Sequence, residues 1–412
     1  MVKIIRISIA GIQSTGKSFF IGGIKSAFMG NNIMDNMQYD ILNNLKNNYF
    51  ESILEIEHDI EDSYVKNNGT TGFHAYLCDI FDSSSKIKIK LAIANIPGEV
   101  YTNFYEGSTN FIGYHTSFEE LIQQNKKAKK LLKKIKSISV RPDWLEWLHS
   151  KLPEQLKNLT SSNFNNLEKN EDKLFELFVE HLKVNYSRTY LTVISIDPNT
   201  KKMRADFKAY VFSYLADQTY LCIDPNPSKE KQSQQNKLLS NFCGNIITNK
   251  NFKSDLNFVI TKFDSLFVNP NQSYLPNRMN CKEDYFIHTD KWLNVISEIL
   301  AGRKPKTLLD KKNIDKLTNY INLIYTSNKL KTVRVDGENF PKNLFLTCIT
   351  NTNQLDQRIP EILDISTFPM NRFPIGCYEI VYSMLLKTEK IQFSQLGLDN
   401  FENYKFVKAY LN

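Results

Sequence analysis

The sequence lacks a long apolar run, and this absence argues against a protein with membrane-spanning helices. No stretch approaches the roughly 18 consecutive apolar residues that indicate a membrane-spanning helix. Residues 1–10 resemble the start of a signal peptide, but they lead into a glycine loop rather than a small-residue cleavage site. We therefore expect a soluble, cytoplasmic protein. Internal repeats and long low-complexity tracts are also missing, which excludes solenoids and coiled arrays.

Cysteine is scarce and scattered. The six cysteines form no CxxC pair and have no Cys/His spacing suited to zinc. A disulfide framework and a zinc module are therefore not expected, and we interpret the cysteines as reduced, mostly buried thiols.

Size and charge set further bounds. A chain of 412 residues exceeds the length at which one hydrophobic core stops growing, so we expect either a core domain with large insertions or two domains. With 42% hydrophobic and 23% charged residues, the composition is that of a folded protein. The net charge of +8 is modest for this length, so basic residues matter only where they cluster.

Strand and helix patterns alternate along the chain. Isoleucine-rich Lys3–Ala10 predicts a buried parallel strand, and apolar residues at helical spacing predict a helix over 18–29. Residues 73–81 and 86–94 predict a hairpin. Further strands are expected at 190–196, 219–223, 256–260 and 344–349, and further helices at 203–216, 229–239 and 375–386.

Two stretches interrupt this alternation and are interpreted as mainly helical insertions, 116–188 and 265–335. In the first, apolar residues from Phe118 to Ile138 recur mostly at helical spacing, which predicts one long amphipathic helix. Its other faces carry seven lysines: Lys126, Lys127, Lys129, Lys130, Lys133, Lys134 and Lys136. Such a run is usually a solvated face, and an acidic protein is the next interpretation; no aromatic residues interleave, which argues against nucleic acid.

The stretch from Gly11 to Ser18, GIQSTGKS, fits the phosphate-binding pattern GxxxxGK[ST] without a mismatch, between a strand and a helix. Its glycines let backbone N–H groups surround phosphates, Lys17 is expected to reach the β and γ oxygens, and the Ser18 hydroxyl to bind Mg²⁺. The residues expected to contact the nucleotide here are Gln13, Ser14, Thr15, Gly16, Lys17, Ser18 and Phe19.

A second motif favours guanine. Thr261, Lys262 and Asp264 follow an apolar strand, at the edge where open α/β sheets bind ligands. A carboxylate at Asp264 can accept hydrogen bonds from N1 and N2 of guanine, which adenine does not offer, so GTP is expected over ATP. Cys348 and Ile349, at the end of the last strand, are candidates for contacting the guanine carbonyl.

Residues near the γ-phosphate complete the predicted site. Gly98 can offer its N–H to that phosphate, and Glu99 is the candidate for orienting the attacking water. Asn95 is a candidate magnesium ligand through a bound water. Thr71, preferred over Thr70, is the candidate switch threonine for Mg²⁺ and the γ-phosphate. Lys17, Thr71, Gly98 and Glu99 are thus the candidate catalytic residues.

With these motifs in order, the chain resembles the translation-factor-related class of P-loop GTPases. GIQSTGKS resembles the GxQSxGKS loop of dynamin-like GTPases, and TKFD and the segment Asn95 to Gly98 resemble their TKxD and DxPG. The segment IPGE followed by Tyr101 is similar to GTPases of bacterial conflict systems. Asn95 stands where these families have aspartate, and Gln13 where Ras-like proteins have glycine, so a catalytic rate does not carry over.

The resemblance implies an α/β fold of the Ras-like G-domain type, with a mostly parallel sheet. Its first part would span 1–115 and its second 189–264, separated by the insertion 116–188. After the insertion 265–335, residues 336–412 would close the domain. The expected ligands are GTP or GDP and Mg²⁺.

The expected function is a slow GTPase switch that signals to a protein partner, as in a conflict or antiviral defence system. No internal arginine finger is evident. Two alternatives stay open: a module that binds GTP without hydrolysing it, and a membrane-associated dynamin relative. The chain after about residue 387 is too short for a dynamin-type stalk. Homo-oligomers stay possible and nucleic acid is not expected.

Overall fold

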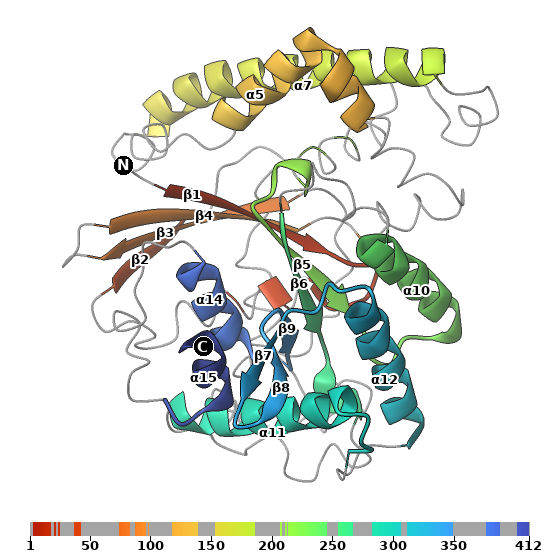
Figure 1. Cartoon of the computed structure of the whole chain (residues 1–412). Coiled ribbons are helices and arrows are strands. Elements are labelled where there is room, and N and C mark those ends of the chain that lie inside the picture. The colour runs from red at the N-terminus through yellow and green to blue at the C-terminus, as the bar shows by residue number, and fades with distance from the viewer. Residues whose placement is uncertain are drawn as a thin grey trace, which may run out of the picture.

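The computed structural model describes an α/β arrangement around one extended sheet (Figure 1). The described residues are 3–17, 20–21, 24, 37–42, 74–82, 87–95, 98, 118–138, 153–185, 207, 211, 213–244, 254–266, 282–305, 311–348, 376–387 and 402–411.

The sheet has seven strands in the order β2-β3-β4-β1-β5-β6-β9. They span β1 Lys3–Ala10, β2 Met37–Leu42, β3 His74–Asp82, β4 Ile87–Asn95, β5 Gln218–Ile223, β6 Asp255–Ile260 and β9 Leu344–Leu346. The strands from β4 to β9 pair in parallel, and β2 and β3 add an antiparallel edge. The predicted α/β class with a mostly parallel sheet is confirmed.

The central strands are rich in apolar residues, as expected for strands buried on both faces. From Ile5 onward every residue of β1 is buried, as are all six residues of β5. The sheet centre is therefore the core of the molecule, and it holds the loops at the strand ends rigidly in place.

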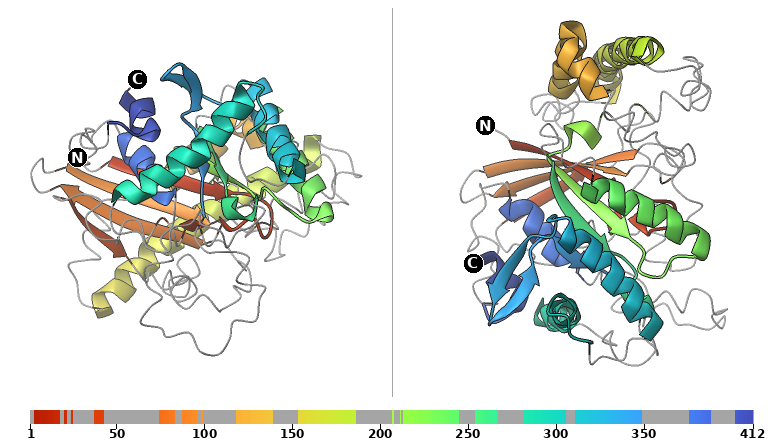
Figure 2. Two further views of the ribbon diagram at one scale, coloured as in Figure 1. Left: turned by 90° about the horizontal axis from the view of Figure 1, so that it is seen from below. Right: turned by 45° about the vertical axis from the view of Figure 1, so that its right-hand side comes forward.

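Helices cover both sides of this twisted sheet. Residues 17, 20, 21 and 24 are helical, as predicted for the segment after β1. In Figures 1 and 2, β5, β6 and β9 run between α14 on one side and α10 and α12 on the other. The bounds are α10 Lys229–Gly244, α11 Lys282–Leu300, α12 Lys311–Thr326, α14 Cys377–Leu386 and α15 Lys405–Leu411.

The first insertion is helical where the structure describes it. α5 Lys126–Ile138 packs on α7 Pro153–Asn185, and both lie beyond the β1 and β4 side of the sheet (Figures 1 and 2). The prediction of one long helix from Phe118 is wrong: the helix is interrupted at Asn125. The Asn125 side chain accepts hydrogen bonds from the N–H groups of Lys127 and Ala128, at 3.0 and 3.1 Å, and so caps α5.

All seven lysines of α5 are exposed, whereas Ala128, Leu131, Leu132 and Ile135 are buried. Edge-to-face contacts of Phe118 with Phe178, Phe207 and Tyr214, at 5.2–5.9 Å between ring centroids, join this insertion to the main core. The insertion is therefore packed on the sheet domain rather than tethered to it.

Two elements were not expected from the sequence. One is the edge strand β2. The other is a hairpin of β7 Thr332–Val335 and β8 Glu338–Pro341, joined by Asp336 and Gly337 with φ of 49° and 84°. Two positive φ values are those of a type I′ turn, which Asp-Gly favours. The second predicted insertion is thus helical in α11 and α12 but ends in a strand.

Among the helices that the structure describes, none is both long and apolar enough to cross a membrane. Cys222, Cys243, Cys348 and Cys377 are buried, as expected from the sequence for most of the cysteines.

Candidate functional site

Four parallel strands end at the same edge of the sheet. β1 leads into Gly11, β5 into Asp224, β6 into Thr261 and β9 into Thr347. β1 and β5 are neighbours, but the chain continues from β1 to β2 on one side and from β5 to β6 on the other, so the connections after these two strands leave in opposite directions. Such a switch point at the carboxyl ends of strands is where open α/β sheets bind ligands.

A tight loop fills this position, and we call residues 11–18 the glycine loop. Gly11 has φ of 148°, and a Cβ there would lie 2.7 Å from Thr15 Oγ1 and 2.9 Å from the Cys222 carbonyl oxygen. Only glycine fits both the space and the backbone angle. Thr15 closes the turn by donating from its hydroxyl to the Ile12 carbonyl at 2.9 Å.

Lys17 lies inside the loop. Its side chain is 6% exposed, and its ammonium donates to the carbonyl oxygens of Gly11 and Ile12 at 2.9 and 2.8 Å. Burial lowers the pKa of Lys17 to about 8, because desolvation disfavours the charged form. Among the described residues, the Lys17 ammonium contacts carbonyl oxygens but no carboxylate. An anion bound in the loop would therefore stabilise its charged form.

Two hydrogen bonds join the residues after β6 to the glycine loop, and an ion pair joins them to Asp224 after β5. The Thr261 hydroxyl donates to the Thr15 carbonyl at 2.6 Å. The Lys262 ammonium donates to the Ser14 carbonyl at 2.9 Å and pairs with Asp224 at 2.7 Å. The sequence motif at 261–264 is thus brought onto the loop from 248 positions away.

Gly98 packs directly against the same loop. A Cβ at Gly98 would lie 2.2 Å from the Gln13 nitrogen and 2.6 Å from the Ile12 carbonyl carbon. No side chain fits there without moving the loop. The predicted neighbours Gly98 and Gln13 therefore meet in space.

The sequence analysis missed two residues that contact this site. Asp224 follows β5, accepts the Lys262 ion pair, and is held by Gln235, whose side chain bonds the Asp224 N–H and carbonyl at 2.9 and 2.8 Å. Lys231, in the first turn of α10, donates to the Ser14 hydroxyl at 2.8 Å. Only the position of Asp224 at a strand end signalled its role in the sequence.

The end of β9 lies beside β6. The Thr347 N–H donates to the Ile260 carbonyl at 2.9 Å, and the Phe263 N–H donates to the Thr347 carbonyl at 3.0 Å. Cys348, the predicted guanine-side residue, is buried. Asp264 belongs to a short 3-10 helix, Phe263–Leu266, that begins two residues after Thr261.

Several predicted site residues lie outside the described part of the chain: Ser18, Phe19, Thr71, Glu99 and Ile349. Asn95 and Asp264 are described as backbone alone, at the end of β4 and after β6. Within the described ranges, no group of three or more His, Cys, Asp or Glu side chains is placed to hold a metal ion.

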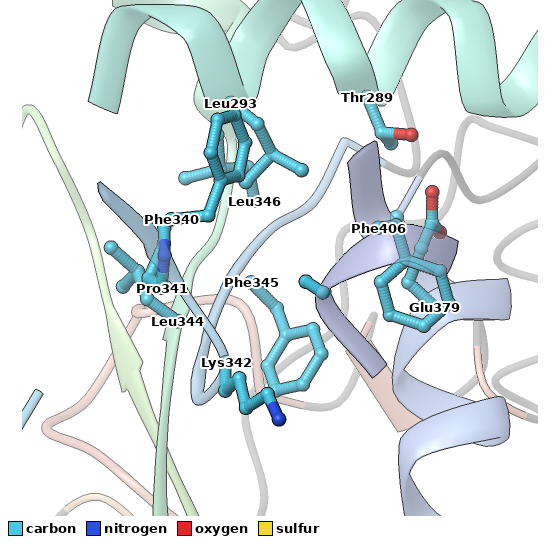
Figure 3. A pocket seen from close by; sticks show the side chains of 12 residues that line it. Thr289, Leu293, Phe340, Pro341, Lys342, Leu344, Phe345, Leu346, Glu379 and Phe406 are labelled. Atoms are coloured by element: carbon cyan, nitrogen blue, oxygen red, sulfur yellow. The ribbon is translucent and has the colours of Figure 1, made fainter. Parts of the chain in front are cut away.

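A separate cavity of about 20 Å³ lies between α11, α14, α15 and the β8–β9 segment (Figure 3). It has space for one water molecule. Thr289 and Glu379 provide polar atoms among mainly apolar walls such as Phe340 and Leu344. Its volume is too small for a nucleotide, and none of its lining residues belongs to the glycine-loop site.

Comparison with known proteins gives no relative. No protein-family model matches the chain, and no curated protein matches it either. The assignment of a function therefore depends on the residues and their geometry alone.

Proposed function

We propose that this chain is a guanine-nucleotide switch that binds GTP with Mg²⁺ and hydrolyses it slowly, with the fold of a Ras-like G domain. The observation that carries the proposal is the buried ammonium of Lys17 inside a loop of backbone amides at the sheet's switch point. A polyphosphate is the anion that we propose for this loop, because backbone N–H groups of a glycine loop before a helix, together with a lysine ammonium, are a general means of binding phosphates.

The residues present support a nucleotide site. Gly11 and Gly98 allow neighbouring protein atoms to approach so closely that any side chain there would clash, which keeps the loop compact, while Ser14 is exposed on its outer side. Ser18, Thr71 and Asn95 are the proposed magnesium-site residues, together with phosphate oxygens of the nucleotide. Neutral Asn95 in place of aspartate supports weaker metal binding and slow turnover.

Guanine is the proposed base. Lys262 contacts the loop while Asp264 follows two residues later, so the β6 end supports a base site beside the phosphate site. A carboxylate there accepts two hydrogen bonds from guanine and leaves adenine unmatched. Cys348 and Ile349, at the neighbouring strand end, are proposed to contact the guanine carbonyl.

Hydrolysis would depend on positioning and charge neutralisation. Gly98 is the proposed γ-phosphate contact and Glu99 the proposed water-orienting residue. The exposed lysine face of α5 is the surface that we propose for an acidic protein partner, since none of its seven lysines has an ion pair among the described residues. The resemblance to conflict-system GTPases supports a defence role for such a switch.

The test is to extract nucleotide from the purified protein and identify it by chromatography, for the wild type, Lys17→Ala and Asp264→Ala. We expect GTP or GDP with the wild type, none with Lys17→Ala, and reduced preference over adenine nucleotides with Asp264→Ala. Phosphate release after adding GTP then separates a slow GTPase from a module that only binds. Adenine nucleotide in the wild type would refute the guanine assignment.

A further inference from the structure

A third ammonium group contacts the glycine loop, in addition to Lys17 and Lys262, and no sequence motif accounts for it. Lys231 is in the first turn of α10, and its Nζ lies 2.8 Å from the Ser14 hydroxyl oxygen. Ser14 is exposed, with φ of 64°, so its hydroxyl stands at the open side of the loop. Lys231 therefore reaches the loop from the side that a ligand would enter.

The charges around Ser14 do not balance. The carbonyl of Ser14 accepts from Lys262, and that lysine is neutralised by Asp224 at 2.7 Å. Lys231 has no carboxylate within ion-pair distance among the described residues, and a neutral hydroxyl is its contact. With Lys17 buried below, two uncompensated ammonium groups flank one short segment of backbone.

An anion held by the loop would lie between these two cations. Phosphate chains are bound in this way by point charges from lysine, in addition to backbone N–H groups. A cation at the outer phosphates also stabilises the charge that develops on them during transfer, which is why an added arginine accelerates such reactions.

We propose that Lys231 supplies a second cation to the phosphate chain of the bound nucleotide, in cis and from the rim of the glycine loop. The inference rests on the proposed function and deepens it. It gives the chain an internal charge for the role that a partner's arginine has in other systems. On binding, the Lys231 ammonium exchanges the Ser14 hydroxyl for a phosphate oxygen.

The experiment compares wild type, Lys231→Ala, Lys231→Arg and Lys237→Ala for binding of GTP, GDP and GMP and for single-turnover GTP hydrolysis. Lys237 is the matched control, an exposed lysine on the same helix with no contact to the loop. We expect Lys231→Ala to lose affinity for GTP more than for GDP, to leave GMP unchanged, and to slow hydrolysis by at least about tenfold. Lys231→Arg restores the charge and should restore the rate, and Lys237→Ala should match the wild type.

Equal affinities and rates in Lys231→Ala and wild type would overturn the inference. An equal loss of affinity for all three nucleotides would also overturn it, because a lysine that only stabilises the loop would not distinguish GTP, GDP and GMP by their number of phosphates. Lys17→Ala separates this failure from failure of the proposed function. If wild type binds and Lys17→Ala does not, the loop site stands and Lys231 alone is excluded; if wild type binds no nucleotide, both proposals fall.

Discussion

Among single residues, Lys17 shows how strongly the site is prepared for an anion. Its ammonium is buried against two carbonyl oxygens, and desolvation lowers its pKa from 10.5 to about 8. The unfolded chain therefore holds the lysine proton more tightly than the folded chain does. The resulting cost to stability is full below about pH 8 and is relieved as the pH rises toward 10.5.

This shift predicts proton uptake on nucleotide binding. Bound phosphates favour the charged form and raise the pKa of Lys17, so binding between about pH 8 and pH 10 takes up a proton. Calorimetry at pH 9 in two buffers of different ionisation enthalpy should show the uptake, and GTP affinity should fall as the pH rises above 8. Lys17→Arg is the control, because arginine stays charged. A binding enthalpy that is the same in both buffers would exclude this account of Lys17.

Glu379 is a buried carboxylate with a different consequence. It is 3% exposed, and neither carboxylate oxygen has a hydrogen-bond partner within geometric limits in the described structure. Burial raises its pKa from 4.5 to about 7, while the Thr289 side chain opposes the shift. The folded chain therefore binds this proton more tightly, and the stability falls as the pH rises from 4.5 to about 7.

Glu379→Gln should remove that dependence. Its thermal unfolding midpoint should equal the wild type at pH 4.5 and exceed it at pH 8, where the charged carboxylate costs about 3 kcal/mol. Glu402→Gln, at an exposed position, should leave the pH profile unchanged. A parallel pH profile for wild type and Glu379→Gln would show that the carboxylate is better solvated than its surroundings indicate.

At the scale of elements, the segment after β4 packs closely against the loop after β1. This packing depends on Gly98, which has no side chain and so lets its backbone approach Gln13 and Ile12. The proposed γ-phosphate contact of Gly98 requires this closeness, because the phosphate would then be shared between the two segments.

Gly98→Ala should therefore displace the glycine loop and weaken GTP binding by at least about tenfold, since an added methyl lies within 2.6 Å of loop backbone. Gly302→Ala is the control away from the loop: its Cβ would meet no atom within 4 Å, and the strain at its φ of 69° should lower stability without affecting GTP binding. Fluorescent-nucleotide titration measures both variants. Unchanged affinity in Gly98→Ala would mean that the loop moves freely and is not a preformed cradle.

Across the whole molecule, the sequence predicted the parts in which each residue's neighbours lie nearby along the chain. β1, β5 and β6 are short segments rich in apolar residues, and the β3–β4 hairpin joins adjacent strands, so the local pattern was sufficient. β2, with the mixed sequence MQYDIL, is an edge strand that depends on pairing with β3. The division of the basic helix at Asn125 depends on a side-chain cap within an otherwise regular repeat.

The candidate site also has a part that local sequence predicted and a part that it did not. The loop GIQSTGKS and the segment from Thr261 could be recognised as motifs, and the structure brings them together. The contact of Lys231 with Ser14 joins residues 217 positions apart, and no local sequence pattern predicts it. Tertiary packing alone decides which surface lysine reaches the loop.

The central claim is that the glycine loop is a preformed site for a polyphosphate. The most direct test is a calorimetric titration with GTP in magnesium buffer, carried out on the purified wild-type chain and on Lys17→Ala. The account predicts saturable binding of one GTP per wild-type chain and no measurable binding by Lys17→Ala. Absence of binding by the wild type to any purine triphosphate, or equal binding by both proteins, would contradict it.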